Sequence, residues 1–139
     1  MKIEMGHLKE AIFWAKSHYW TTRQPGIRRK RNNAGVRVAY LEKANWYAFV
    51  FSRFHASSLA VFQKLPTLDA YFYKEVISSG SNFAAWCIDG NHFGDVVRQL
   101  QGMPDMEIEF VVKDSGKGLV IPESFQAMGL MFYSRCVHK

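Results

Sequence analysis

The sequence predicts an α+β domain with a mainly antiparallel sheet of about five or six strands and two main helices packed on one face. Short segments with alternating apolar residues, such as VRVAYL and MEIEF, are typical of strands. Two longer segments, at 2–20 and 89–101, carry apolar residues at helical spacing. Hydrophobic residues make up 48% of the chain and charged residues 22%, which is ordinary for a globular protein.

The chain is expected to be a single domain, 1–139, with a basic arm or loop at 21–35. A length of 139 residues is close to the commonest size of one domain. No repeat, low-complexity tract or linker divides the sequence.

The first third of the chain predicts one helix and a hairpin. A helix is expected over 2–20, and it should be over by Pro25-Gly26. Apolar alternation then predicts two antiparallel strands at about 36–42 and 45–54, joined by a short connection.

The middle of the chain is ambiguous. Residues 59–65 could form a third strand that ends at Pro66. Residues 67–78 fit either a short helix or a strand through Ala70 to Ile77, and the three- to four-residue spacing of the apolar positions favours the helix. The continuous apolar run from Phe83 to Ile88 predicts a buried strand.

The last third has clearer boundaries. A helix is predicted after Asp89, with an apolar stripe at Phe93, Val96, Val97 and Leu100 and a stop at Gly102. A strand at 106–113 should return as a hairpin at 119–121. One helical turn at 122–128 and a final strand at 130–137 complete the prediction.

The net charge of +6 is concentrated in the N-terminal third. Residues 1–43 hold ten Lys and Arg against three acidic residues, a net charge of +7. Residues 44–139 hold eight basic and nine acidic residues, a net charge of −1. This asymmetry points to an acidic partner at the N-terminal third.

The arm is the strongest candidate site, and DNA or RNA is its expected partner. Arginine presents a planar fork of donors to phosphate or to a guanine edge, and asparagine can pair with adenine. The alternative is a solvated loop, or one that meets a protein partner. The expected nucleic-acid-binding residues are Arg23, Arg28, Arg29, Lys30, Arg31, Asn32, Asn33 and Arg37.

The string YAFVF at 47–51 matches the central positions of the aromatic strand motif of RNA-recognition modules. Asn45 and Trp46 replace the basic residue and glycine of that motif, so the similarity is only local. Tyr47, Phe49 and Phe51 share one face of a strand, and this face is expected to be core.

No metal site and no cofactor is predicted. Cys87, His92, Cys136 and His138 could form a Cys2His2 set, but their spacing is not that of a zinc module. Buried reduced cysteines are the commoner outcome.

The sequence favours a protein without enzymatic activity. Pro104-Asp105 begins like a PD-(D/E)xK nuclease motif, but no acid stands two places before Lys113. Neither a P-loop nor a GxGxxG motif is present. His92 and Asp95 lie three residues apart on a predicted helix and could form an acid–base pair.

The alternative function is a homodimeric module that binds a protein or a small ligand, with an incidental basic loop. The chain has more large aromatic residues than one small core hides easily, so some should form an exposed patch. These residues are Phe13, Trp14, Trp20, Trp46, Phe54, Tyr71, Phe72, Tyr73 and Trp86.

A cytoplasmic location without membrane contact is expected. The longest apolar runs fall far short of the roughly 20 residues that a membrane span needs. The N-terminus does not resemble a signal peptide, and two cysteines do not make a secreted disulfide framework.

Overall fold

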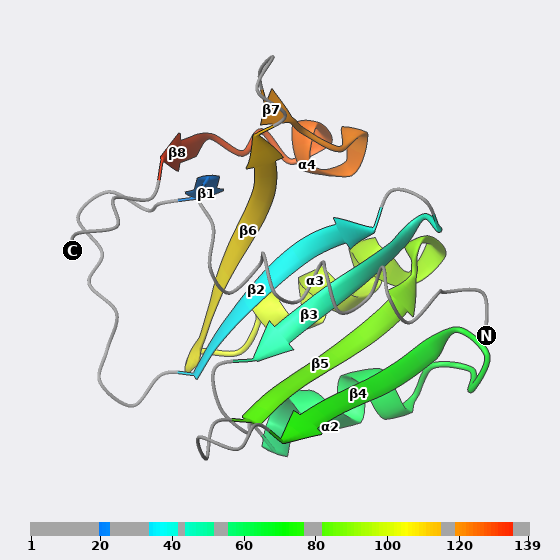
Figure 1. The fold of residues 1–139 in the computed structure, drawn as a ribbon. Helices are drawn as coiled ribbons and strands as arrows, with labels where there is room; N and C mark the ends of the chain where they lie inside the picture. Colours follow the sequence, from blue (N-terminus) through cyan, green and yellow to red (C-terminus); the bar gives the residue numbers. More distant parts are fainter. Residues whose placement is uncertain are drawn as a thin grey trace.

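A computed structural model describes residues 20–22, 34–41, 44–51, 56–76, 82–114 and 119–134. In these ranges the chain forms one mixed sheet with helices packed against it (Figure 1). The predicted α+β class is therefore confirmed. Residues 2–19 of the predicted helix (2–20) and residues 23–33 of the predicted arm (21–35) lie outside the described residues.

The sheet runs in the order β4-β5-β3-β2-β6-β1-β8, and β7 pairs with β6 beside this path. Every pair is antiparallel except β2–β6, which is parallel. Five longer strands make up its body, and β1, β7 and β8 are short. The strands are β1 (Trp20–Thr22), β2 (Ala34–Leu41), β3 (Trp46–Phe51), β4 (Ala70–Val76), β5 (Asn82–Asp89), β6 (Met106–Asp114), β7 (Leu119–Val120) and β8 (Phe132–Ser134).

Three α-helices occur in the described ranges: α2 (Ala56–Gln63), α3 (Phe93–Gln101) and α4 (Glu123–Ala127). A single 3-10 turn, η1 (Gly90–His92), links β5 to α3. None of the helices in the described ranges has the length and apolarity to cross a membrane.

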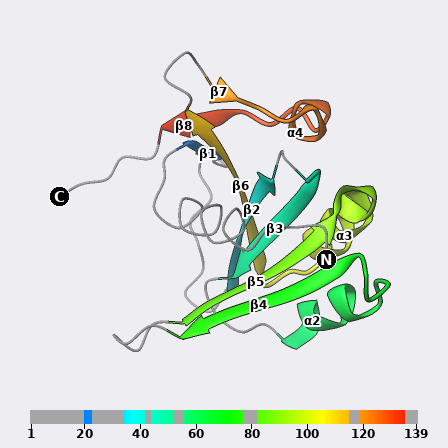
Figure 2. The ribbon, with the colours of Figure 1, turned by 45° about the vertical axis from the view of Figure 1, so that its right-hand side comes forward.

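The main core lies between the sheet and the helices. The helices α2 and α3 lie on the same side of the sheet (Figures 1 and 2). Two helices on one face agree roughly with the prediction, but only α3 is one of the two helices that the sequence predicted. Phe62 of α2 stacks on Trp86 of β5 with ring centroids 5.3 Å apart. The predicted apolar stripe of α3 is buried in the same cluster, and Phe125 brings α4 to it.

The opposite face of the sheet is also apolar and buried. Its cluster alternates along the strands with the residues of the main core, and none of the described helices contributes a buried residue to it. Small side chains are common here, including Ala39, Ala48 and Ala85. Trp46 is only 2% exposed, so it is not part of a surface patch.

Several predicted elements are confirmed. The strands β2 and β3 form the expected antiparallel hairpin, with Val38 opposite Phe49. The strand β5, the helix α3, the β6–β7 hairpin and the short helix α4 lie where the sequence predicts them. The strand β8 covers the described part of the predicted last strand.

Three predictions were wrong. Residues 56–63 form a helix rather than a strand at 59–65, with Ser58, Val61 and Phe62 buried at helical spacing. The favoured helix at 67–78 is the strand β4, which is the alternative that the sequence left open. Trp20 belongs to the strand β1 and not to the end of a helix, because β1 pairs with both β6 and β8.

Candidate ligand-binding site

A hydrogen-bonded corner forms where β2 ends and β3 begins. Asn45 adopts a left-handed backbone conformation with φ of 52°, which asparagine tolerates better than most residues. The Tyr40 hydroxyl donates to Asn45 Oδ1 over 3.1 Å. The Gly90 N–H donates to the Asn45 carbonyl over 2.9 Å, which ties the corner to the end of β5.

Gly90 is required by this close approach. A Cβ atom at position 90 would lie 2.7 Å from the Asn45 carbonyl oxygen, which is closer than Cβ atoms come to other heavy atoms in proteins. The glycine therefore allows η1 and the β2–β3 corner to come together.

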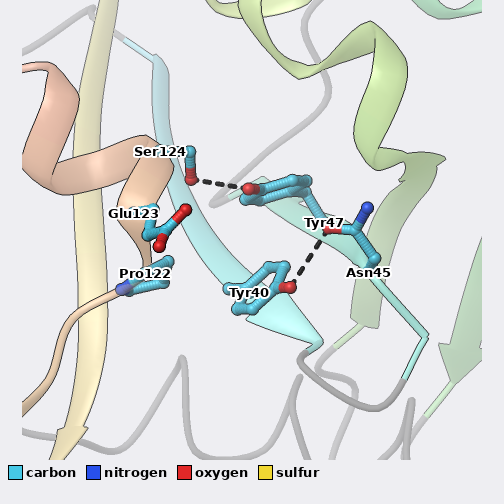
Figure 3. Close-up of a pocket in the computed structure, with 6 residues that line it drawn as sticks. All are labelled: Tyr40, Asn45, Tyr47, Pro122, Glu123 and Ser124. Carbon is cyan, nitrogen blue, oxygen red and sulfur yellow. Dashed lines mark hydrogen bonds between the residues drawn. The ribbon is translucent and has the colours of Figure 1, made fainter.

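The helix α4 brings a second group of side chains to this corner. Its first turn follows Pro122, whose carbonyl accepts the Phe125 and Gln126 N–H groups. The Phe125 ring is fully buried and packs 5.2 Å from the ring of Phe110 in β6. This anchor holds Glu123 and Ser124 beside the tyrosines of the hairpin (Figure 3).

Tyr47 connects the two groups. Its hydroxyl and that of Ser124 share a hydrogen bond of 2.5 Å, in which either oxygen can donate. Its ring stacks on Phe93 at 4.1 Å and lies 4.9 Å from the ring of Tyr40. The ring thus belongs to the core, while the hydroxyl faces the corner.

The Tyr47 hydroxyl keeps its proton at physiological pH. Burial, the largest effect, raises its pKa above the ordinary value of 10.0, the hydrogen bond with Ser124 lowers it, and the neighbouring Tyr40 raises it. The net shift is upward, so the hydroxyl acts as a neutral donor and acceptor.

A cavity of about 400 Å³ opens between these elements. Small-molecule sites in proteins commonly range from about 300 to 1,000 Å³. Figure 3 shows the Glu123 carboxylate pointing toward the tyrosines across this space. The lining residues are Tyr40, Asn45, Tyr47, Pro122, Glu123 and Ser124.

The predicted pair of His92 and Asp95 does not form. His92 Nε2 lies 2.9 Å from Asp69 Oδ2, whereas Asp95 pairs with Arg98 at 3.0 Å on the outer surface of α3. The acid–base hypothesis for His92 and Asp95 is therefore wrong. The reason is the position of Asp69, which follows α2 in the chain. Its carbonyl accepts the Asp89 N–H at the end of β5, and this bond places the Asp69 carboxylate beside His92.

No metal centre appears in the part of the chain that the structure describes, where no group of three His, Cys, Asp or Glu residues could hold an ion. Cys87 lies on β5, fully buried among apolar residues, and burial raises the pKa of its thiol to about 12. Cys136 and His138 of the considered Cys2His2 set lie outside the described residues.

The expected nucleic-acid site is described at one position only. Arg37 is half-buried in the middle of β2, where it lies opposite Glu109 of the parallel strand β6. The other expected residues lie outside the described ranges: Arg23, Arg28, Arg29, Lys30, Arg31, Asn32 and Asn33.

The aromatic residues are mostly core within the described ranges. Tyr47 and Phe49 are buried, as expected for the YAFVF face, and Phe51 packs against them. Of the aromatic residues proposed for a surface patch, Phe72 on β4 is 44% exposed, whereas Tyr73 is buried. Phe13, Trp14 and Phe54 lie outside the described residues.

The cavity itself was not predicted from the sequence. Tyr47 and Ser124 are separated by 77 positions, and no motif in the sequence links them. Only the antiparallel alternation of β2 and β3, which puts Tyr40 opposite Tyr47, could have suggested two neighbouring hydroxyls.

Comparison of the chain with protein-family models, with curated proteins and with solved structures found no match.

Proposed function

We propose that this protein is a non-enzymatic binding module that takes a small ligand in the cavity between the β2–β3 corner and α4. The observation that carries the proposal is the cavity of about 400 Å³ with three hydroxyl groups and one carboxylate on its wall. Pockets that combine aromatic rings with a few convergent polar groups are the usual form of ligand sites.

The chemistry of the lining supports binding rather than catalysis. A nucleophile needs an adjacent base to activate it. The Ser124 hydroxyl is instead hydrogen-bonded to the neutral Tyr47 hydroxyl, and within the described part of the chain it has no hydrogen bond to a carboxylate or an imidazole. His92, which pairs with Asp69, is not among the described residues that line the cavity. The wall therefore offers oriented hydrogen-bonding groups without an activated nucleophile.

A fragment titration followed by nuclear magnetic resonance tests this function. A library of small polar and aromatic fragments should shift the backbone amide signals of Asn45, Tyr47 and Ser124 at millimolar concentration. Signals from the far end of β2, such as that of Val36, should stay in place. The proposal is wrong if no fragment shifts the amides around the cavity.

A matched pair of variants assigns the binding to the cavity. Tyr40→Ala removes one wall, and we expect it to weaken fragment binding by on the order of tenfold. Tyr71→Ala removes another half-buried tyrosine, on the opposite face of the sheet, and should leave the affinity unchanged. Equal losses in the two variants would contradict a site at the cavity.

A second candidate function is nucleic-acid binding through the basic arm. The charge asymmetry supports it, because residues 1–43 carry a net +7 and the remainder a net −1. Each phosphate contact releases counterions, so the logarithm of the affinity should fall linearly with the logarithm of the salt concentration. We expect a slope of several units, measured by fluorescence anisotropy with duplex and single-stranded probes.

The arm can be tested by charge removal at matched positions. Replacing Arg28, Arg29, Lys30 and Arg31 by alanine should remove most of the salt slope. Replacing Lys64 and Lys74, which are both exposed outside the arm, should have a small effect. Absence of binding to either probe at low salt would end this second hypothesis.

A further inference from the structure

We propose that the cavity recognises a ligand that carries an ammonium group, either primary or quaternary. This inference rests on the proposed small-ligand function and assigns the ligand its charge. Its observations are an unpaired carboxylate, the half-buried ring of Tyr40 and a wall that presents mainly hydrogen-bond acceptors.

Glu123 supplies the counter-charge. Within the described part of the chain its carboxylate has no hydrogen bond and no ion pair, and it points into the cavity (Figure 3). The other described carboxylates at this end of the sheet are already engaged. Asp69 holds His92, and Asp89 accepts the Asn91 N–H.

The hydroxyl groups strengthen the preference for a donor-rich ligand. The Tyr40 proton is directed to Asn45, which leaves the Tyr40 oxygen with its acceptor lone pairs. In the bond between Tyr47 and Ser124 one hydroxyl donates to the other, the accepting hydroxyl keeps its own proton, and both oxygens keep acceptor capacity. A primary ammonium group offers donors and no acceptor, so it complements these oxygens.

The Tyr40 ring adds attraction for a cation. It is half-buried on the wall opposite α4, whereas the Tyr47 ring, 4.9 Å away, is buried against Phe93 and presents its hydroxyl to the cavity. A cation near a tyrosine ring is attracted by the negative face of the ring. The Glu123 carboxylate and the Tyr40 ring together also suit a quaternary ammonium group, which cannot donate hydrogen bonds.

An anionic ligand is disfavoured by the same wall. No lysine or arginine is among the described residues that line the cavity. Among these described residues an anion would meet the Glu123 carboxylate without a compensating positive charge.

Three probes of nearly equal shape and different charge test the inference. Choline carries the ammonium group, 3,3-dimethyl-1-butanol is its neutral counterpart, and 3,3-dimethylbutyrate is an anion. Each is titrated into the full chain, and the shifts of the Asn45, Tyr47 and Ser124 amides give the dissociation constant. We expect choline to bind on the order of tenfold more tightly than the alcohol, and the anion to bind most weakly.

Variants separate the carboxylate from the rings. Glu123→Gln should reduce choline binding to about the level of the alcohol and leave the affinity for the alcohol unchanged. Asp95→Asn makes the same charge change on the outer surface of α3 and should alter neither affinity. Tyr40→Phe keeps the ring and should retain choline binding, whereas Tyr40→Leu should weaken it.

The outcomes distinguish the two proposals. If the alcohol binds at the cavity as tightly as choline, or if Glu123→Gln leaves choline binding unchanged, the ammonium inference is overturned and the small-ligand function stands. If neither these probes nor the fragment library shifts the amides around the cavity, both proposals are overturned.

Discussion

Tyr47 has a ring in the core and a hydroxyl in the cavity, so one substitution can separate these roles. Tyr47→Phe keeps the stack on Phe93 and removes the hydrogen bond with Ser124. We expect it to lower the free energy of unfolding at neutral pH by about 1 kcal/mol. Urea denaturation followed by circular dichroism measures this loss.

The same variant should be less sensitive to alkaline pH. Burial raises the pKa of Tyr47 above 10.0 in the folded protein, so the folded state holds this proton at a pH where the unfolded chain has released it. The stability linked to Tyr47 is therefore full below about pH 10 and is lost as the pH rises through the folded pKa. Between about pH 9 and pH 11 the wild type should lose more stability than Tyr47→Phe. Parallel losses in the two proteins would contradict the assigned pKa shift.

Two glycines four positions apart should respond oppositely to alanine. At Gly90 a new Cβ would lie 2.7 Å from the Asn45 carbonyl oxygen, whereas at Gly94, in α3, no atom lies within 4 Å. We expect Gly90→Ala to lower the free energy of unfolding by about 1 to 3 kcal/mol, because the backbone at Asn45 or at position 90 must move to make room for the Cβ atom. Gly94→Ala should raise the free energy of unfolding by about 0.5 to 1 kcal/mol, because alanine loses less backbone entropy than glycine when a helix forms. Thermal unfolding of the two variants checks both signs, and a stable Gly90→Ala would show that the corner can relax.

The cavity residues illustrate why sites are harder to predict than folds. Tyr40, Asn45 and Tyr47 belong to one hairpin whose pairing the sequence does predict. Glu123 and Ser124 come to them because Phe125 is buried against Phe93 and Phe110. Nothing in local periodicity shows where that anchor docks, so the two halves of the site cannot be joined from sequence alone.

At the scale of elements, prediction succeeds where the apolar pattern has one period and a clear end. The helix α3 shows this, with a buried stripe at helical spacing and Gly102 after its last turn. The helix α2 misleads because Leu59 and Val61 alternate like strand residues, while burial follows Ser58, Val61 and Phe62. The pattern alone could not identify Ser58 as a buried position.

The strand β4 was misread for a related reason. It lies at one end of the described strand order, with exposed Phe72 and Lys74 beside buried Tyr73. Because this strand has aromatic residues on both faces, apolar and polar residues do not alternate along it. The three- to four-residue spacing of its apolar residues, which resembled that of a helix, was fortuitous. The high strand propensity of its aromatic residues was the better indicator.

The packing of α3 gives the prediction at this scale. Leu100 is fully buried against the sheet, whereas its neighbour Gln99 is exposed. Leu100→Ala should reduce the free energy of unfolding by about 2 to 5 kcal/mol, through lost burial and a residual cavity. Gln99→Ala should change it by less than about 0.5 kcal/mol. Similar effects in urea denaturation would contradict the assigned face of the helix.

At the scale of the whole molecule, the two apolar clusters are built on the same strands. Consecutive residues of β3 point to opposite faces, so Phe49 belongs to the helix-covered core and Val50 to the other cluster. Disrupting one face should therefore displace the strands that support the other. We expect the described sheet to unfold as one cooperative unit, as small single domains usually do.

Two tryptophans on opposite faces can test this coupling. Trp86 packs against the helix-covered core, and Trp46 is buried in the other cluster. Single-tryptophan versions, with the remaining tryptophans replaced by phenylalanine, report each face separately by fluorescence during urea denaturation. Each fluorescence midpoint should coincide with the circular dichroism midpoint of the same version, because neither face can lose its packing while β2, β3 and β5 stay paired. A Trp46 transition at clearly lower urea than the loss of circular dichroism would show that the second face opens independently.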